Sequence, residues 1–250
     1  MVFKFQFQYQ IIIFILGSPS VHKVFGNKMA ILAGDYLLAR ASIALARLRN
    51  VEVVEIMSTI IEHLVRGEVM QLKPPPTTAS DQSLSSLQLE YYLKKNFFKT
   101  ASLMANSCRS TAVLANLPHD VVQLSYLYGK HVGVAFQLVD DLLDFRVGDI
   151  TNLGKPSYND LRSGLATAPV LFAAQTYPQL FPLVQRKFKN DGDVDTAIEI
   201  VHNSDGILRT QHLAQVHAEL AVDAIMQLEQ SDYRDALVNL ALKISERGHK

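Results

Sequence analysis

Tryptophan is absent from the 250-residue chain, and there is one cysteine, Cys108. A lone cysteine excludes an internal disulfide and fits a reducing compartment, so Cys108 is expected to be a small buried apolar side chain. Net charge is also lacking, because 24 basic residues balance 24 acidic ones. The chain therefore has none of the basic excess that a nucleic-acid-binding protein needs, and we expect no nucleic-acid partner.

The start of the chain lacks the features of a targeting or membrane segment. Ile11–Leu16 is apolar, but a helix that crosses a membrane needs about 20 apolar residues. The basic region and cleavage site of a signal peptide and the Arg- and Ser-rich pattern of a transit peptide are missing. Residues 3–11 instead alternate apolar and polar side chains, which is typical of a strand. We expect residues 1–16 to be an atypical apolar leader, either from a wrong or alternative first exon or serving as a membrane-surface anchor.

Most of the remaining sequence has helical periodicity. The pattern predicts helices over residues 28–49, 51–72, 86–116, 119–146, 159–175, 193–203, 206–229 and 231–247. Three consecutive prolines at 74–76 and the polar residues 77–86 predict one loop, and residues 148–160 predict another. No repeat or long linker divides the chain. Residues 17–250 are therefore expected to form one all-α domain of large antiparallel helices.

Three carboxylates stand in an otherwise apolar helical segment, with the spacing Asp140-Asp141-x-x-Asp144. On a helix, Asp140 and Asp144 lie one turn apart on one face, with Asp141 beside them. Like charges this close repel each other unless a cation lies among them, and Mg²⁺ commonly binds through one or two carboxylates plus phosphates. The spacing predicts a magnesium site for a diphosphate. The alternative, a solvated helix end, is disfavoured by the apolar flanks.

Further polar side chains are expected near these aspartates. Lys99 and Thr100 interrupt an apolar helical stretch and are suited to bind phosphate oxygens, although an isolated lysine there more often extends to solvent. Gln137 precedes the first two aspartates by about one helical turn, so its amide is expected on the same face. Lys155 follows in a Gly-Lys-Pro loop, as a cation placed to close over a phosphate. Asp35, within an apolar helix, is expected to be buried.

Taken in order, these motifs resemble those of the trans-isoprenyl diphosphate synthases, the all-α family that includes farnesyl, geranylgeranyl and long-chain polyprenyl diphosphate synthases. The resemblance covers about residues 17–250. It is carried by Gly34-Asp35-x-x-Leu38, Lys99-Thr100-Ala101, Phe136-Gln137-x-x-Asp140-Asp141-x-x-Asp144, Gly154-Lys155 and Asp160-Leu161. Residues 22–28 and 30–35 are most similar to the solanesyl and decaprenyl synthases, which make quinone side chains. The resemblance implies a single antiparallel helix bundle of the isoprenoid synthase type.

The resemblance also implies a reaction, the addition of isopentenyl diphosphate to an allylic diphosphate, with farnesyl or geranylgeranyl diphosphate as the expected primer. The allylic C–O bond ionises, the double bond of isopentenyl diphosphate attacks the cation, and a proton is lost. The residues assigned by this resemblance are Asp140, Asp141 and Asp144 as Mg²⁺ ligands, Lys99 and Lys155 at the leaving diphosphate, Thr100 and Gln137 near the allylic cation, and His22 at isopentenyl diphosphate. Fixed cations stabilise the charge that develops on the leaving group.

One part of the family pattern is missing from the sequence. The family carries a first aspartate-rich motif, ending in Arg-Arg-Gly, just before the stretch that corresponds to residues 17–22, but no aspartate precedes Asp35 here. The Gly-Lys-x-x-Arg segment that binds isopentenyl diphosphate is missing as well. Losing roughly 4 kcal/mol of charge stabilisation slows a step about a thousandfold. The chain alone is therefore expected to be inactive or nearly so, with a core-facing surface left uncovered.

Three interpretations stay open. The first is a truncated polyprenyl diphosphate synthase, and the second is a non-catalytic partner subunit of a heteromeric synthase, against which the retained aspartates argue. The third, a terpene cyclase or a coincidental acidic patch, is disfavoured by the Phe-Gln-x-x-Asp-Asp-x-x-Asp form. By resemblance we expect a homodimer or a heteromer with a related subunit, and a mitochondrial location. A plastid or cytoplasmic location and peripheral membrane association stay open.

Overall fold

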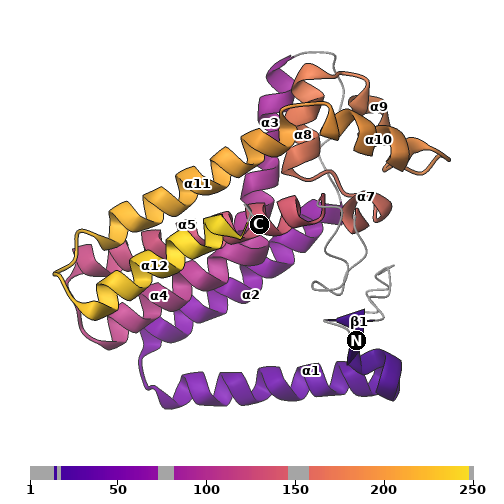
Figure 1. Ribbon diagram of the computed structural model, residues 1–250. Helices are drawn as coiled ribbons and strands as arrows, with labels where there is room; N and C mark the ends of the chain where they lie inside the picture. Colours follow the sequence, from indigo (N-terminus) through magenta and orange to yellow (C-terminus); the bar gives the residue numbers. More distant parts are fainter. Residues whose placement is uncertain (1–13, 16–17, 73–81, 146–157, 248–250) are drawn as a thin grey trace.

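The computed structural model describes residues 14–15, 18–72, 82–145 and 158–247 of the chain (Figure 1). Two short antiparallel strands, β1 (Phe14–Ile15) and β2 (Ser18–Pro19), precede the helices in this part. The helical elements are α1 (Val21–Arg47), α2 (Val51–Leu72), α3 (Gln82–Asn96), η1 (Phe97–Ala101), α4 (Ser102–Leu114), α5 (His119–Leu143), α7 (Asn159–Arg162), α8 (Ala168–Thr176), α9 (Leu180–Gln185), α10 (Asp193–His202), α11 (Gly206–Ile225) and α12 (Asp232–Glu246). The predicted all-α fold is confirmed, whereas the alternating residues 3–11 lie outside the described part.

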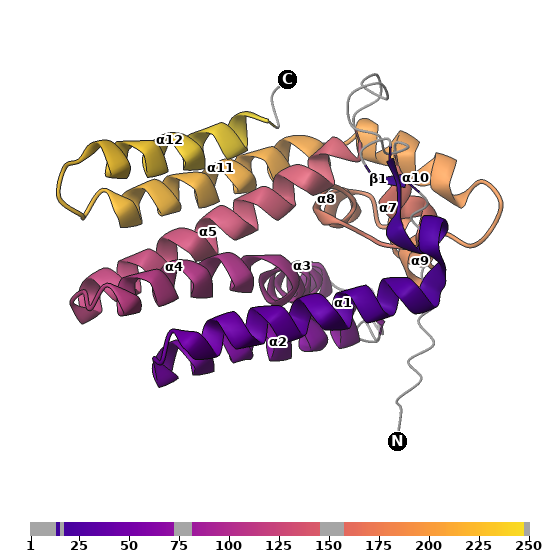
Figure 2. The same cartoon turned by 90° about the horizontal axis from the view of Figure 1, so that it is seen from below.

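Helix α5 is the centre of the bundle. Figure 2 shows α12, α11, α5, α4 and α2 in succession, with α1 drawn in front of α2, and α5 packs against α11 on one side and α4 on the other. Small side chains allow α5 and α11 to approach closely, because Ala135, Ala218 and Ala221 are all buried in one cluster. Cys108 is partly buried against the same cluster, in keeping with its expected apolar role. The packing fixes the position of the α5 end that carries the aspartates.

Lys99 and Thr100 lie in η1, a single π-helical turn between α3 and α4. The predicted helix over 86–116 is therefore continuous but bent, since α3 runs across the bundle while α4 runs along it (Figure 1). A π turn inside an α-helix is frequent at functional sites, because it changes the direction of the side chains that follow it.

Two glycines let η1 pack against its neighbours. A Cβ atom built on Gly67 of α2 would lie 2.5 Å from Cγ of Lys99. A Cβ atom on Gly133 of α5 would lie 2.5 Å from Cα of Ala101. Larger residues at either position would push the backbone away, so the glycines hold the Lys99–Thr100 turn close to both α2 and α5.

The prediction of one helix over residues 159–175 is wrong. Helix α7 ends at Arg162, and α8 begins only at Ala168. Between them, Gly164 adopts a φ of +77°, which lies outside the helical region and interrupts regular helix. Pro169 stands in the first turn of α8, where its missing N–H is tolerated. The structure also has the short helix α9, which no predicted helix covers.

Helix α1 is the outermost helix, and none of its residues is buried. Asp35 is exposed, so the expectation that it is buried is wrong, because α1 contributes no side chain to the core. Within the described residues, α1 is the one helix that is long and apolar enough, by length and composition, to cross a membrane. Core helices of soluble proteins and signal sequences meet the same criterion, so this property assigns no membrane span.

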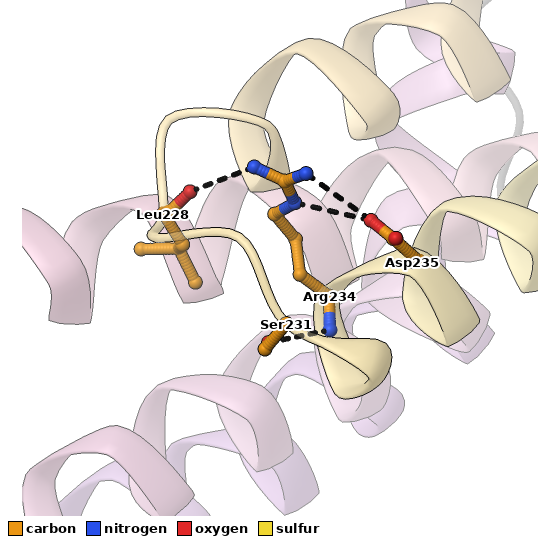
Figure 3. Close-up of polar contacts among 4 residues, drawn as sticks. All are labelled: Leu228, Ser231, Arg234 and Asp235. Carbon is orange, nitrogen blue, oxygen red and sulfur yellow. Dashed lines mark hydrogen bonds and ion pairs between the residues drawn. The ribbon is translucent and has the colours of Figure 1, made fainter.

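The turn between α11 and α12 is held by polar contacts of Ser231 and Arg234 (Figure 3). The hydroxyl oxygen of Ser231 accepts a hydrogen bond of 3.1 Å from the backbone N–H of Arg234, which caps α12. The Arg234 guanidinium donates to the carbonyl oxygen of Leu228 at 3.2 Å and to the carboxylate of Asp235 at 3.2 and 3.3 Å. These bonds join the end of α11 to the start of α12 and keep the two helices antiparallel.

Candidate functional site

The three aspartates of the motif have different surroundings at the C-terminal end of α5. Asp140 is exposed, Asp141 is only 3% exposed, and Asp144 is partly buried at the C-cap. Among the described residues, no group of three or more His, Cys, Asp or Glu side chains is arranged to hold a metal ion. The helix brings the three carboxylates to one end of the bundle, but burial separates Asp141 from the other two.

Hydrogen bonds connect Asp141 to the Lys99–Thr100 turn. The hydroxyl of Tyr92 on α3 donates to Oδ2 of Asp141, and Nε2 of Gln137 donates to Oδ1 at 2.8 Å. The Thr100 hydroxyl in turn donates to Oε1 of Gln137 at 2.7 Å. Thr100, Gln137 and Asp141, which the sequence predicts to be site residues, are therefore joined in one network.

The network is buried, and burial changes its acid–base properties. Burial raises the pKa of Asp141 to about 6, although hydrogen bonds from Tyr92 and Gln137 and the nearby Lys95 ammonium act in the opposite direction. Burial and the neighbouring carboxylate raise the pKa of Tyr92 well above its ordinary value, so the phenol stays a hydrogen-bond donor at neutral pH. Burial lowers the pKa of Lys95, whose Nζ lies 5.3 Å from the centroid of the Tyr92 ring.

Asp144 fixes the start of α7. Its two carboxylate oxygens accept hydrogen bonds from the backbone N–H groups of Asn159 and Asp160, at 2.9 and 3.0 Å. The first N–H groups of a helix have no partner within the helix, and a carboxylate there also interacts favourably with the helix dipole. A carboxylate oxygen can accept one hydrogen bond and still bind a cation, so these two bonds do not by themselves exclude Asp144 as a ligand.

Lys99 is held by α2 through two contacts. Its Nζ lies 2.7 Å from Oε1 of Glu68 and donates to Oε1 of Gln71 at 2.9 Å. The side chains of Lys99 and Glu68 are 23% and 27% exposed, so the lysine is directed into the protein rather than fully into solvent. An anion that binds Lys99 has to share or displace the carboxylate of Glu68.

Two predicted site residues are on neither η1 nor the C-terminal end of α5. His22 lies in the first turn of α1, and its one side-chain hydrogen bond among the described residues is to Ser20, at 3.4 Å. Lys155 lies outside the described residues. The structure therefore joins three of the predicted residues, Thr100, Gln137 and Asp141, at the junction of η1 and α5. Lys99 is next to Thr100 in η1, and Asp140 and Asp144 are at the same end of α5 as Asp141.

Residues 17–201 match the polyprenyl synthetase family. The chain belongs to this family. A probable mitochondrial hexaprenyl pyrophosphate synthase of Neurospora crassa is 51% identical over 231 residues, which cover 92% of this chain and 51% of that protein. The mitochondrial solanesyl-diphosphate synthase 1 of Oryza sativa subsp. japonica is 46% identical over 233 residues, covering 92% and 52%. The chain thus spans about half the length of these curated relatives.

Solved structures of the family agree with the observed fold. The chain aligns with the apo form of an Arabidopsis medium/long-chain length prenyl pyrophosphate synthase with a TM-score of 0.75 and 43% identity, covering 90% of this chain and 75% of that one. A polyprenyl synthase of Caulobacter crescentus, solved with calcium and isoprenyl diphosphate, gives a TM-score of 0.78 and 30% identity, covering 92% and 70%. The all-α isoprenoid synthase fold predicted by resemblance is confirmed.

The side chains at this end of α5 are of the chemical type that binds a divalent cation. Asp140 and Asp144 supply hard carboxylate oxygens one helical turn apart, and Asp140 is exposed. Asp141 fits less well, because both of its oxygens already accept hydrogen bonds in the interior. A cation at this end of α5 would therefore be held by the outer two aspartates of the motif.

Four polar residues at the site were not found from the sequence. They are Tyr92, Lys95, Glu68 and Gln71. Tyr92 and Lys95 precede Lys99 by two turns and one turn of helix, and this shared face is a signal that helical spacing offers. No such signal exists for Glu68 and Gln71, because a predicted loop separates them from Lys99 and hides their proximity.

Proposed function

We propose that this chain acts in prenyl transfer, adding isopentenyl diphosphate to an allylic diphosphate and so lengthening a polyprenyl chain of the kind used for quinones. One observation carries the proposal: hydrogen bonds join the Asp-rich end of α5 to the Lys99–Thr100 turn through Gln137. In this proposal, the carboxylate end of α5 serves a cation, and Lys99, which is next to Thr100, serves a diphosphate. Family membership and the long-chain synthases among the relatives support the same reaction.

The leaving diphosphate is the group that the site has to stabilise. Mg²⁺, held by Asp140 and Asp144, would supply positive charge to its oxygens. The Lys99 ammonium would donate to the same group, giving up part of its contact with Glu68. Lys155, which follows α5 in the sequence, would add a second cation. Electrostatic stabilisation of this type is commonly the largest contribution to catalysis.

In this proposal, Thr100 and Gln137 lie next to the allylic carbon atoms of the substrate. The Thr100 hydroxyl donates to Gln137, so its oxygen lone pairs remain available to an electron-poor allylic group. The amide is held by two hydrogen bonds and needs no reorientation as the C–O bond breaks. The double bond of isopentenyl diphosphate would then form the new C–C bond, with His22 proposed to contact its diphosphate.

Prenyl transfer tests the proposal directly. The substrates are labelled isopentenyl diphosphate with farnesyl or geranylgeranyl diphosphate, in the presence of Mg²⁺. Because no aspartate precedes Asp35 in the printed sequence, we expect the chain alone to be about a thousandfold slower than the same chain joined to the N-terminal part of a longer relative. Long-chain product from the joined protein that is lost with Asp140→Asn supports the proposal. A joined protein with no product, or with product unaffected by Asp140→Asn, contradicts it.

Assembly and location are part of the same proposal. We propose a homodimer or a heteromer with a related synthase subunit, and a mitochondrial location, which is how the relatives of Neurospora crassa and Oryza sativa are described. Mixing the chain with a complete synthase separates a catalytic from a non-catalytic role. If Asp140→Asn supports product formation in the mixture as well as the unchanged chain does, the chain serves as a non-catalytic subunit.

A further inference from the structure

Tyr92 is an enclosed polar side chain next to the Asp-rich motif. It comes from α3, is 3% exposed, and donates its hydroxyl to Oδ2 of Asp141. The ammonium of Lys95 lies over its ring. A buried carboxylate is costly unless its oxygens are hydrogen-bonded, so the Tyr92 hydroxyl is one of the groups that keep Asp141 in the interior.

The position of Asp141 in turn determines how the Gln137 amide is oriented. An ionised carboxylate only accepts hydrogen bonds, so the amide must turn Nε2 toward Asp141, where the distance to Oδ1 is 2.8 Å. Because the amide nitrogen bonds to Asp141, the amide oxygen Oε1 faces Thr100 and accepts a hydrogen bond of 2.7 Å from its hydroxyl Oγ1. The direction of the Gln137 dipole, and with it the partner of Thr100, therefore depends on where Asp141 is held.

We propose that Tyr92 is a positioning residue that fixes the orientation of the Gln137 amide through Asp141, and that Asp141 is an internal anchor rather than a direct metal ligand. The role in catalysis rests on the proposed function, since a fixed amide matters for prenyl transfer only if an allylic substrate binds beside it. Asp140, which is exposed, and Asp144, which is only partly buried, are then the motif carboxylates assigned to a cation.

Side-chain amide NMR of the ¹⁵N-labelled 250-residue chain tests the positioning role without any ligand. The Gln137 signals are identified by their loss in Gln137→Glu. We expect Tyr92→Phe to shift these signals and to speed exchange of the amide hydrogens with water about tenfold. Tyr91→Phe is the matched control, because the adjacent hydroxyl donates to the carbonyl oxygen of Met70 at 2.9 Å and should leave Gln137 unchanged. Unchanged Gln137 signals in folded Tyr92→Phe overturn the proposal.

A second variant covers the case in which Tyr92→Phe fails to fold because Asp141 loses a donor. Asp141→Leu has a similar shape but no oxygen that can accept from Nε2 of Gln137, whichever way the side chain turns. We therefore expect the Gln137 signals to move in this variant too. Signals that stay in place in folded Asp141→Leu contradict the relay through Asp141.

Mn²⁺ binding in the presence of inorganic diphosphate, followed by electron paramagnetic resonance, tests the anchor role. Asp141→Asn is expected to weaken Mn²⁺ binding about tenfold, as for a residue that acts through others, and Asp140→Asn to weaken it more. The reverse order overturns the anchor. If the unchanged chain binds no Mn²⁺ with diphosphate, the same comparison is made in the chain joined to the N-terminal part of a longer relative. Absence of binding there too contradicts the proposed function and the anchor role, whereas the Gln137 signals still decide the positioning role.

Discussion

The imidazoles of His131 and His217 meet where α5 packs on α11, with their Nδ1 atoms 2.9 Å apart. One ring must donate and the other accept, so the pair holds one proton between these atoms and not two. Burial lowers the pKa of both histidines, and that of His217 falls to about 4, with the His131 and Lys130 charges acting in the same direction. The unfolded chain therefore binds more protons than the folded one between pH 6.5 and 4.

The sign of the pH dependence follows from this difference. The contribution of the histidine pair to stability is complete above about pH 6.5 and is lost as the pH falls toward 4. In urea titrations, the free energy of unfolding of His217→Gln is compared with that of the unchanged chain. We expect the difference to move in favour of the variant by about 2 kcal/mol when the pH is lowered from 7 to 4.5, after allowance for partial solvent exposure. The buried Asp141 acts in the opposite direction but is common to both proteins. An identical stability difference at the two pH values would contradict this account.

Single residues differ in how far the sequence reveals their surroundings. The sequence predicted correctly that Asp140 and Asp144 lie one helical turn apart, because they are four residues apart, but not that they lie where α5 ends. The burial of Asp141 was not predicted, since it depends on Tyr92, 49 positions away on another helix. The surroundings of Lys99 depend likewise on Glu68, whose position follows from the packing of α2 and not from any local pattern.

At the scale of elements, the fit of η1 against α5 depends on a glycine. In Gly133→Ala, the new Cβ would lie 2.5 Å from the backbone Cα of Ala101, so one helix has to move. Overpacking of this kind costs more than the roughly 1 kcal/mol that alanine gains in helix propensity, and we expect a net loss of about 2 kcal/mol. Chemical denaturation measures the loss. The matched control is Gly34→Ala in exposed α1, where nothing lies within 4 Å and a small gain in stability is expected. Equal effects of the two substitutions would refute the packing explanation.

The start of α12 supplies a second prediction at this scale. Ser231→Ala removes the side-chain oxygen that accepts from the Arg234 backbone N–H. The loss of an N-cap costs about 1 kcal/mol, which thermal or urea denaturation resolves. Ser42→Ala is the control, since this hydroxyl only donates back to the carbonyl of Leu38 within exposed α1. We expect it to change the free energy of unfolding by less than about 0.5 kcal/mol.

The elements themselves were largely predictable where the helical period is long. Helices α2, α5, α10, α11 and α12 were expected within a few residues of their bounds. The π turn η1 was not, because it preserves helical periodicity on both sides and depends on close packing at Gly67 and Gly133. The break between α7 and α8 was missed for a different reason: Gly164 and Pro169 are tolerated singly in helical patterns but together end one helix and start another.

For the whole molecule, helical periodicity and the absence of long strand patterns were sufficient to predict an all-α bundle, and the ordered motifs were sufficient to predict its family. The exposure of α1 was predicted only in general terms, as a core-facing surface left uncovered. In the structure this surface is an apolar helix without a buried residue. Large exposed apolar patches on proteins favour association, so α1 should dominate how the chain behaves at high concentration.

The last prediction concerns this surface. Ile31 and Leu37 are 64% and 67% exposed, so replacing both with glutamine removes apolar surface without opening a cavity. Self-association measured by sedimentation velocity should weaken at least about fivefold, while the free energy of unfolding changes by less than about 0.5 kcal/mol. Val53→Ala, at a site that is 1% exposed on α2, should instead lose about 2 kcal/mol of stability and leave association unchanged. If the double substitution unfolds the chain, α1 is held by contacts stronger than its exposure implies. If self-association is unchanged, another surface of the chain is responsible for it.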